Sequence, residues 1–248
     1  MKQKKILKPG NECSFQKMGI GQSLAIFAAA SIALILETQL LIPALSAAAG
    51  LEPILSWFIV AGVGIFTPML MVTAFILRKE GALFQPGFWR NRLRFHRMNR
   101  GDWFWSFGAI IVIGIMSSGM MKGAEVIVGQ MEPQPSFMSF EPLTSERYWV
   151  LGIWLPYWIL NIMGEEILWR GTMLPRQELA FGKQTWLFHS MGWGIFHIAF
   201  GWQLLVILLP VLFIQPYVVQ RRKNTWVGVV IHGGINGSGF LAIAFGLL

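Results

Sequence analysis

Long apolar segments dominate this chain of 248 residues and constrain its fold more than any other feature. A helix needs about 20 mostly apolar residues to cross the hydrocarbon core of a bilayer, and several segments reach that length. Charged residues make up only 13% of the chain, about half of the share that is usual in soluble domains. Strands are not expected in these segments, because lipid offers no partner to an open sheet edge. We therefore predict an all-α fold: a polytopic transmembrane helical bundle that forms one integral-membrane domain over residues 1–248.

About seven segments qualify as membrane spans, and short loops join most of them. The fifth is short for a full crossing, and the fourth has room to extend beyond its last residue. The predicted spans are Ile20–Ala48, Ile54–Leu77, Trp103–Val128, Tyr148–Arg170, Thr185–Ala199, Trp202–Val219 and Trp226–Leu247.

The distribution of charge predicts the orientation of these spans. Basic residues gather in the N-terminal tail and in the loops after the second, fourth and sixth spans, whereas the loop at 129–147 is mainly acidic. Since basic loops favour the cytoplasmic side, we predict a multi-pass protein of the cell membrane with a cytoplasmic N-terminus. The loop from Arg78 to Asp102 alternates arginine with aromatic residues and is expected to contact anionic membrane lipid.

The charge distribution and the cysteine count narrow the partners and the covalent or metal links that this chain can have. The net charge of +8 does not indicate a nucleic-acid partner, because lysine and arginine are confined to patches between apolar runs. A single cysteine, Cys13, excludes an intrachain disulfide and a cysteine-based metal cluster.

Ionisable residues inside the predicted spans are candidates for a functional site, because a charge in the membrane is costly. Glu165, Glu166 and Arg170 lie near the end of the fourth span, His197 lies in the fifth and His232 in the last. With a rise of about 1.5 Å per residue, Glu165 and the two histidines reach a similar depth in the cytoplasmic half of the membrane. The sequence therefore predicts that these three helices converge there.

Spacing within the helices predicts separate roles for these side chains. Glu166 and Arg170 are four residues apart, as in an intrahelical ion pair, which leaves Glu165 free to face the bundle interior. Glu165, helped by His197, is suited to deprotonate a water molecule. His232 and Asn236 also share a helix face, and both can donate hydrogen bonds to an oxyanion. This set of groups fits the hydrolysis of an amide.

The same three segments resemble the CPBP family, also called Abi, of CAAX prenyl endopeptidases and bacteriocin-processing proteins. The family pattern is Glu-Glu-x-x-x-Arg, then Phe-x-x-x-His, then His-x-x-x-Asn or Asp. The resemblance extends over about residues 145–245 and implies a glutamic intramembrane protease. In this chain the pattern falls on Glu165, Glu166 and Arg170, on Trp193 and His197, and on His232 and Asn236.

The resemblance also implies a role for each of these residues. Glu165 and His197 would activate water, and His232 with Asn236 would form the oxyanion site. Glu166, Arg170 and Trp193 would support them. Trp193 stands where the family has phenylalanine, and because an aromatic ring is kept, we expect the exchange to affect substrate fit rather than the chemistry.

Neither the cofactor nor the function follows from the resemblance alone. We expect no cofactor, the alternative being a divalent metal such as zinc bound by Glu165, His197 and His232. The expected substrate is a peptide or a lipidated protein, either prenylated or a secreted peptide. Two other functions stay open: a non-catalytic immunity or scaffold protein of the same fold, and a proton-coupled transporter, although no inverted repeat supports the latter.

Two further ionisable residues fall outside the motifs. Glu37 lies inside the first span and is a candidate for lining a substrate cavity. His189 lies two turns before His197 but about 80° around the helix from it, so we predict a structural role for it.

Overall fold

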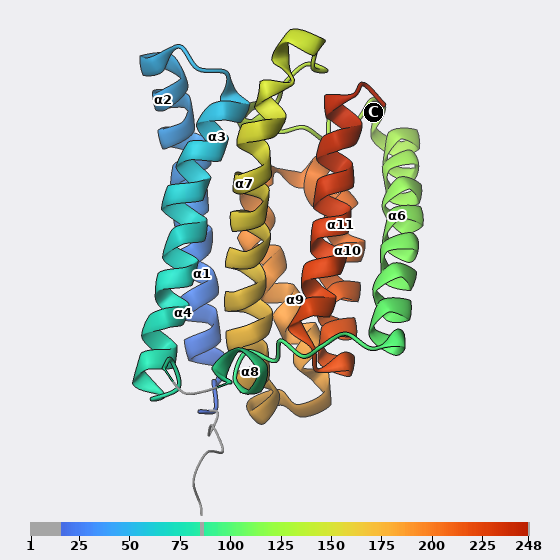
Figure 1. The fold of residues 1–248 in the computed structure, drawn as a ribbon. Helices are drawn as coiled ribbons and strands as arrows, with labels where there is room; N and C mark the ends of the chain where they lie inside the picture. Colours follow the sequence, from blue (N-terminus) through green and yellow to red (C-terminus); the bar gives the residue numbers. More distant parts are fainter. Residues whose placement is uncertain (1–15, 85–86, 248) are drawn as a thin grey trace, which may run out of the picture.

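The structure, a computed structural model, describes residues 16–84 and 87–247. Cys13 and most of the basic N-terminal tail lie outside the described residues. Within them the chain is helical and contains no strand, and its long helices run side by side in one bundle (Figure 1). The predicted all-α fold is confirmed.

Within the described residues, three rods of this bundle each contain a π-helical segment between two α-helices. A π-helix carries hydrogen bonds from residue i to i+5 and is found mostly as a single turn inside an α-helix, frequently at a functional site. The rods are α1 (Ile20–Leu36), η1 (Glu37–Leu41) and α2 (Ile42–Ala49); α3 (Pro53–Ala61), η2 (Gly62–Phe66) and α4 (Thr67–Lys79); and α7 (Trp149–Glu165), η5 (Glu166–Met173) and α8 (Leu174–Phe181).

The other helices complete the bundle and its loops. They are α5 (Phe88–Asn91), α6 (Arg100–Val128), α9 (Thr185–Phe196), α10 (Trp202–Arg222) and α11 (Thr225–Ala244), with short 3₁₀ turns η3 (Ser136–Met138), η4 (Ser145–Arg147), η6 (Gly182–Gln184) and η7 (His197–Phe200).

In the described part of the chain, five helical rods are long and apolar enough to cross a membrane, and they correspond to five of the predicted spans. The fourth and fifth predicted spans are also helical, but their extents differ from the prediction. The fourth does not end at the charged residues: it continues past Arg170 through η5 into α8. The fifth is only α9 and η7, too short for a full crossing.

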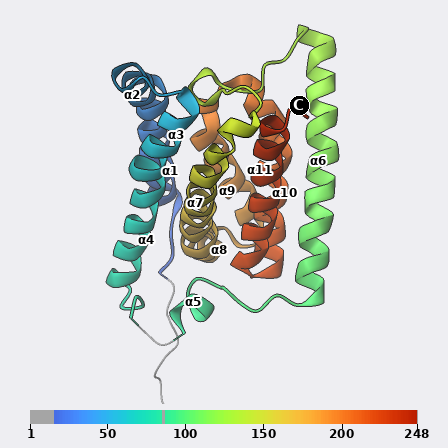
Figure 2. The ribbon, with the colours of Figure 1, turned by 45° about the horizontal axis from the view of Figure 1, so that its top comes forward.

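The helix that carries the two glutamates lies in the centre of the bundle. In Figures 1 and 2, α7 is flanked by α1 and α4 on one side and by α10 and α11 on the other, with α6 at the outer edge. Helix α9 packs against both α1 and α10. Side chains that point inward from α7, α9 and α11 therefore face a shared interior.

Ion pairs join the basic loops at one end of the bundle. Arg94 pairs with Glu178 at 3.0 Å, which connects the loop after α4 to α8. Arg222, at the end of α10, pairs with Asp102 at 2.8 Å. Asp102 and Asn99 also form the capping box at the N-terminus of α6. The basic loops thus meet at one end, as the charge pattern predicts.

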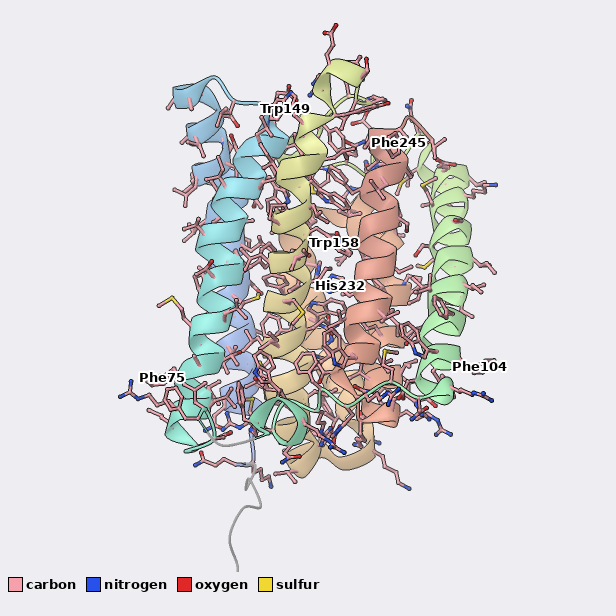
Figure 3. The ribbon with its side chains drawn as sticks, in the orientation of Figure 1. Phe75, Phe104, Trp149, Trp158, His232 and Phe245 are labelled. Atoms are coloured by element: carbon pink, nitrogen blue, oxygen red, sulfur yellow. The ribbon has the colours of Figure 1, made fainter. Side chains whose placement is uncertain are left out.

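The outer surface of the bundle is apolar, with aromatic rings near both ends. Figure 3 places the exposed Phe75 and Phe104 near one end and the exposed Trp149 and Phe245 near the other. Aromatic side chains at two levels of an apolar surface are typical of the two interfaces of a membrane. His232 lies between these levels, beside α7.

Candidate active site

The two glutamates of the first motif stand at the junction of an α-helix and a π-helix. Glu165 is the last residue of α7, and Glu166 is the first residue of η5. All eight residues of η5 are buried, Arg170 among them. The predicted ion pair is present, with Arg170 Nη1 at 3.3 Å from Glu166 Oε1.

Glu166 is the centre of a buried polar cluster that joins three helices. Its Oε1 atom accepts a hydrogen bond from Gln215 Nε2 of α10 at 2.8 Å and lies 2.9 Å from His232 Nδ1 of α11. Gly228 of α11 allows this approach, because a Cβ atom there would lie 2.2 Å from Glu166 Oε2. The carboxylate thereby fixes the position of Arg170 and the orientation of the His232 ring.

Glu165 is held by the indole of Trp193. Trp193 Nε1 donates a hydrogen bond of 2.8 Å to Glu165 Oε2. The guanidinium of Arg170 lies over the same indole, 3.5 Å from the ring centroid, and the rings of His197 and His232 contact it edge-on at 5.1 and 5.7 Å. The buried indole of Trp193 therefore contacts side chains of all three motifs: Glu165 and Arg170 of the first, His197 of the second and His232 of the third.

The proton on His197 can be placed from its hydrogen bond. His197 Nδ1 lies 2.8 Å from the backbone oxygen of Trp193. A carbonyl oxygen only accepts hydrogen bonds, so Nδ1 carries the proton and Nε2 of the neutral ring keeps a lone pair. His197 is therefore oriented to accept a proton through Nε2.

The structure brings six of the seven motif residues together, and Asn236 stands apart. Its side chain is exposed and makes no hydrogen bond with any residue that the structure describes. The neighbouring Gly233 and Gly237 pack against Trp158 of α7, at 3.1 and 3.2 Å from an ideal Cβ position. Asn236 thus lies on α11 one turn beyond His232 without a hydrogen bond to the described residues of the polar cluster.

His189 is fully buried, and its Nδ1 lies 2.7 Å from Gln177 Oε1 of α8. Its ring meets Phe27 of α1 edge-on. The histidine thus connects α9 to α8 and α1 instead of to the glutamates.

Sequence reasoning missed two residues of the cluster, Gln215 and Gly228. Gln215 is a polar side chain in the middle of an apolar helix, the same signal that singled out the glutamates. The sequence does not single out Gly228, because its role depends on how closely the Glu166 carboxylate approaches α11 in the folded chain.

Among the described residues, no three histidine, cysteine, aspartate or glutamate side chains are grouped in a way that could hold a metal ion. In the alternative set of Glu165, His197 and His232, both histidines use Nδ1 for a hydrogen bond within the protein. His232 presents Nδ1 to Glu166, and His197 presents Nδ1 to a backbone oxygen.

Comparison with known families matches residues 147–238 to the type II CAAX prenyl endopeptidase Rce1-like family. No curated protein and no solved structure matches the chain. The matched segment runs from the start of α7 to α11 and contains all three motifs and the polar cluster. In this segment, the chain is similar to the Rce1-like family of type II CAAX prenyl endopeptidases.

Proposed function

We propose that this protein is an intramembrane endopeptidase that hydrolyses a peptide bond with water activated by Glu165 and His197. The match of residues 147–238 to a family of endopeptidases supports a protease. The main support for the residue roles is the position of Trp193, whose indole joins the Glu165 carboxylate to the rings of both histidines.

The water would be activated between α7 and η7. One oxygen of Glu165 accepts from Trp193, which leaves the other for a water molecule. His197 offers the lone pair of Nε2. A carboxylate and a neutral imidazole can together take the proton as the water oxygen attacks the carbonyl carbon.

The oxyanion would be stabilised from α11. Because Nδ1 of His232 is occupied by Glu166, its Nε2 is the nitrogen that can reach a substrate carbonyl. The Asn236 amide, free of other described partners, can donate a second hydrogen bond once substrate is bound.

Two observations distinguish this proposal from the other candidate functions. A scaffold protein would have no use for Glu165, whose carboxylate contributes no ion pair among the described residues and bonds only to Trp193. A proton-coupled transporter would use the same buried acids as a relay, but the matched family consists of endopeptidases.

The proposal is tested by peptide cleavage with the purified protein in detergent. The substrates are matched peptides that end in a cysteine and three further residues, with and without a prenyl group on the cysteine. We expect mass spectrometry to detect two fragments, and the same rate with a metal chelator present. Failure of the folded protein to cleave either peptide would contradict the proposal, and loss of cleavage with the chelator would favour the metal alternative.

Trp193→Phe should lower kcat roughly 10- to 100-fold, because a hydrogen bond to a charged group is worth about 1.5–3 kcal/mol. Phenylalanine keeps the ring over Arg170 but removes the N–H that holds Glu165. Trp186→Phe, on the same helix, is the matched control and should leave kcat unchanged. An unchanged kcat in Trp193→Phe would mean that this hydrogen bond does not position the glutamate.

A further inference from the structure

The side chain of Asn161 is a buried amide one helical turn before Glu165 in α7. It is 6% exposed, and its Oδ1 atom is buried without a hydrogen-bond partner among the described residues. The backbone N–H groups around it belong to a continuous helix, whose own hydrogen bonds already use them. A partner for Oδ1 must therefore come from outside α7.

Helix geometry places this amide beside the proposed catalytic base. Residues four apart in an α-helix lie on the same face, with their Cβ atoms about 5–6 Å apart. This spacing applies to Asn161 and Glu165, because α7 is α-helical up to Glu165 and the π segment begins only at Glu166. Asn161 thus lies one turn from Glu165, toward the end of the bundle where Figure 3 labels Trp149.

The neighbours of Asn161 on the same helix pack against different parts of the bundle. The ring of Tyr157 packs against α3, with ring centroids 4.6 Å apart. Trp158 packs against α11, 3.1 Å from the ideal Cβ position of Gly233. At about 100° per residue, Asn161 and Glu165 both point between these two rings. The amide and the carboxylate therefore face the same part of the interior.

Glu37 is a second buried acceptor without a partner, but it lies in another rod. Its carboxyl packs against Gly64 of η2, where any Cβ atom would overlap it, and its Oε2 atom has no partner among the described residues. Asn161 differs from it in lying on the same helix face as Glu165.

A buried amide oxygen without a hydrogen bond is costly, so its presence in a native fold calls for a use. A buried asparagine in a membrane protein usually bonds to a neighbouring helix. In the described part of the chain, no helix offers a donor to Asn161 Oδ1. A peptide substrate can offer one, because a chain bound in extended form presents one backbone N–H about every 3.4 Å.

We propose that Asn161 binds the substrate: its Oδ1 atom accepts a hydrogen bond from a backbone N–H of the peptide, within two residues of the bond that is cleaved. This inference rests on the proposed function, in which Glu165 sets the position of the cleaved bond. The limit of two residues follows from the spacing, since about 5–6 Å along α7 is less than two residues of extended peptide.

This hydrogen bond would set the register of the peptide, so that its carbonyl carbon faces the water activated by Glu165 and His197. It also makes Asn161 a determinant of specificity. A proline at the recognised position has no N–H, so the site selects against peptides with proline there.

The test combines a change in the protein with a change in the substrate. In a series of peptides, a backbone ester replaces one amide at a time, at the two positions on each side of the cleaved bond. One of these esters should lower kcat/KM of the unchanged protein roughly 10-fold, the worth of one lost hydrogen bond. Mass spectrometry confirms that cleavage stays at the same amide.

Asn161→Leu keeps the size and branching of the side chain but has no hydrogen-bonding group. It should lower kcat/KM for the all-amide peptide roughly 10-fold, and the sensitive ester should then cost it less than about 2-fold. Asn91→Leu makes the same change at an exposed residue of α5 and should leave kcat/KM unchanged.

Thermal unfolding gives a second readout that a structural role would move in the opposite direction. Because leucine removes a buried acceptor that has no partner, Asn161→Leu should unfold at the same temperature as the unchanged protein or above it. A structural asparagine would lose stability together with activity, or would not fold at all without its amide, and either result would overturn the inference.

The remaining outcomes separate this inference from the proposed function. If every ester leaves kcat/KM of the unchanged protein within about 2-fold, or if the sensitive ester costs Asn161→Leu as much as it costs the unchanged protein, the inference is overturned and the protease remains. If Glu165→Gln keeps its activity on the all-amide peptide, the proposed function itself fails, whatever Asn161 does.

Discussion

Replacing Glu165 with glutamine should lower kcat for a cleavable peptide by roughly 10²–10⁴-fold, the range that general base catalysis usually contributes. Glutamine has nearly the same size and can still meet the Trp193 N–H through its amide oxygen. It cannot take a proton from water at neutral pH. The change should therefore affect turnover while the fold and the peptide affinity are kept.

The measurement is kcat with the peptide used for the cleavage test, together with peptide binding and thermal unfolding of the same preparation. Glu146→Gln makes the same chemical change at an exposed position and should behave as the unchanged protein. A Glu165→Gln protein that still turns over at the original rate would assign the catalytic base elsewhere.

Arg170→Met should lower the free energy of unfolding by about 3–5 kcal/mol, because it leaves the Glu166 carboxylate buried without its cation. Both side chains of this pair are completely buried, and Glu166 Oε2 has no hydrogen-bond partner among the described residues. The Arg170 guanidinium also covers the Trp193 ring. Reversible denaturation in mixed detergent micelles measures the change.

The double variant Glu166→Gln with Arg170→Met gives the decisive comparison. Because it removes both charges, it should recover much of the lost stability, as neutral replacements of buried pairs often do. Arg221→Met, at an exposed arginine, should change stability by less than about 0.5 kcal/mol. A double variant as unstable as Arg170→Met would show that packing on Trp193, rather than charge balance, is the main role of the arginine.

The length of the apolar segments predicted the bundle, and the cost of ionisable residues in lipid predicted much of the polar cluster. Three helices bearing Glu165, His197 and His232 do converge, and the Glu166–Arg170 pair follows from a spacing of four residues. The partner of His232 was not predictable, since it depends on how far α11 approaches η5 at Gly228.

The motif does not indicate the hydrogen bond that Trp193 makes to Glu165. The exchange of phenylalanine for tryptophan was expected to affect substrate fit, because both residues are aromatic. In addition, the indole N–H donates to Glu165, a hydrogen bond that phenylalanine cannot make. The orientation of a ring in a packed interior comes from its neighbours, here Arg170 and the two histidines, and not from its place in a motif.

The three π segments have a consequence for how this chain compares with others. Each such turn accommodates one extra residue within a continuous helix, and removing it would rotate every later side chain by about 100°. Insertions and deletions in relatives should then occur inside transmembrane helices as well as in loops. An alignment that allows gaps only between helices would assign Glu37 and Gly64 to the wrong columns.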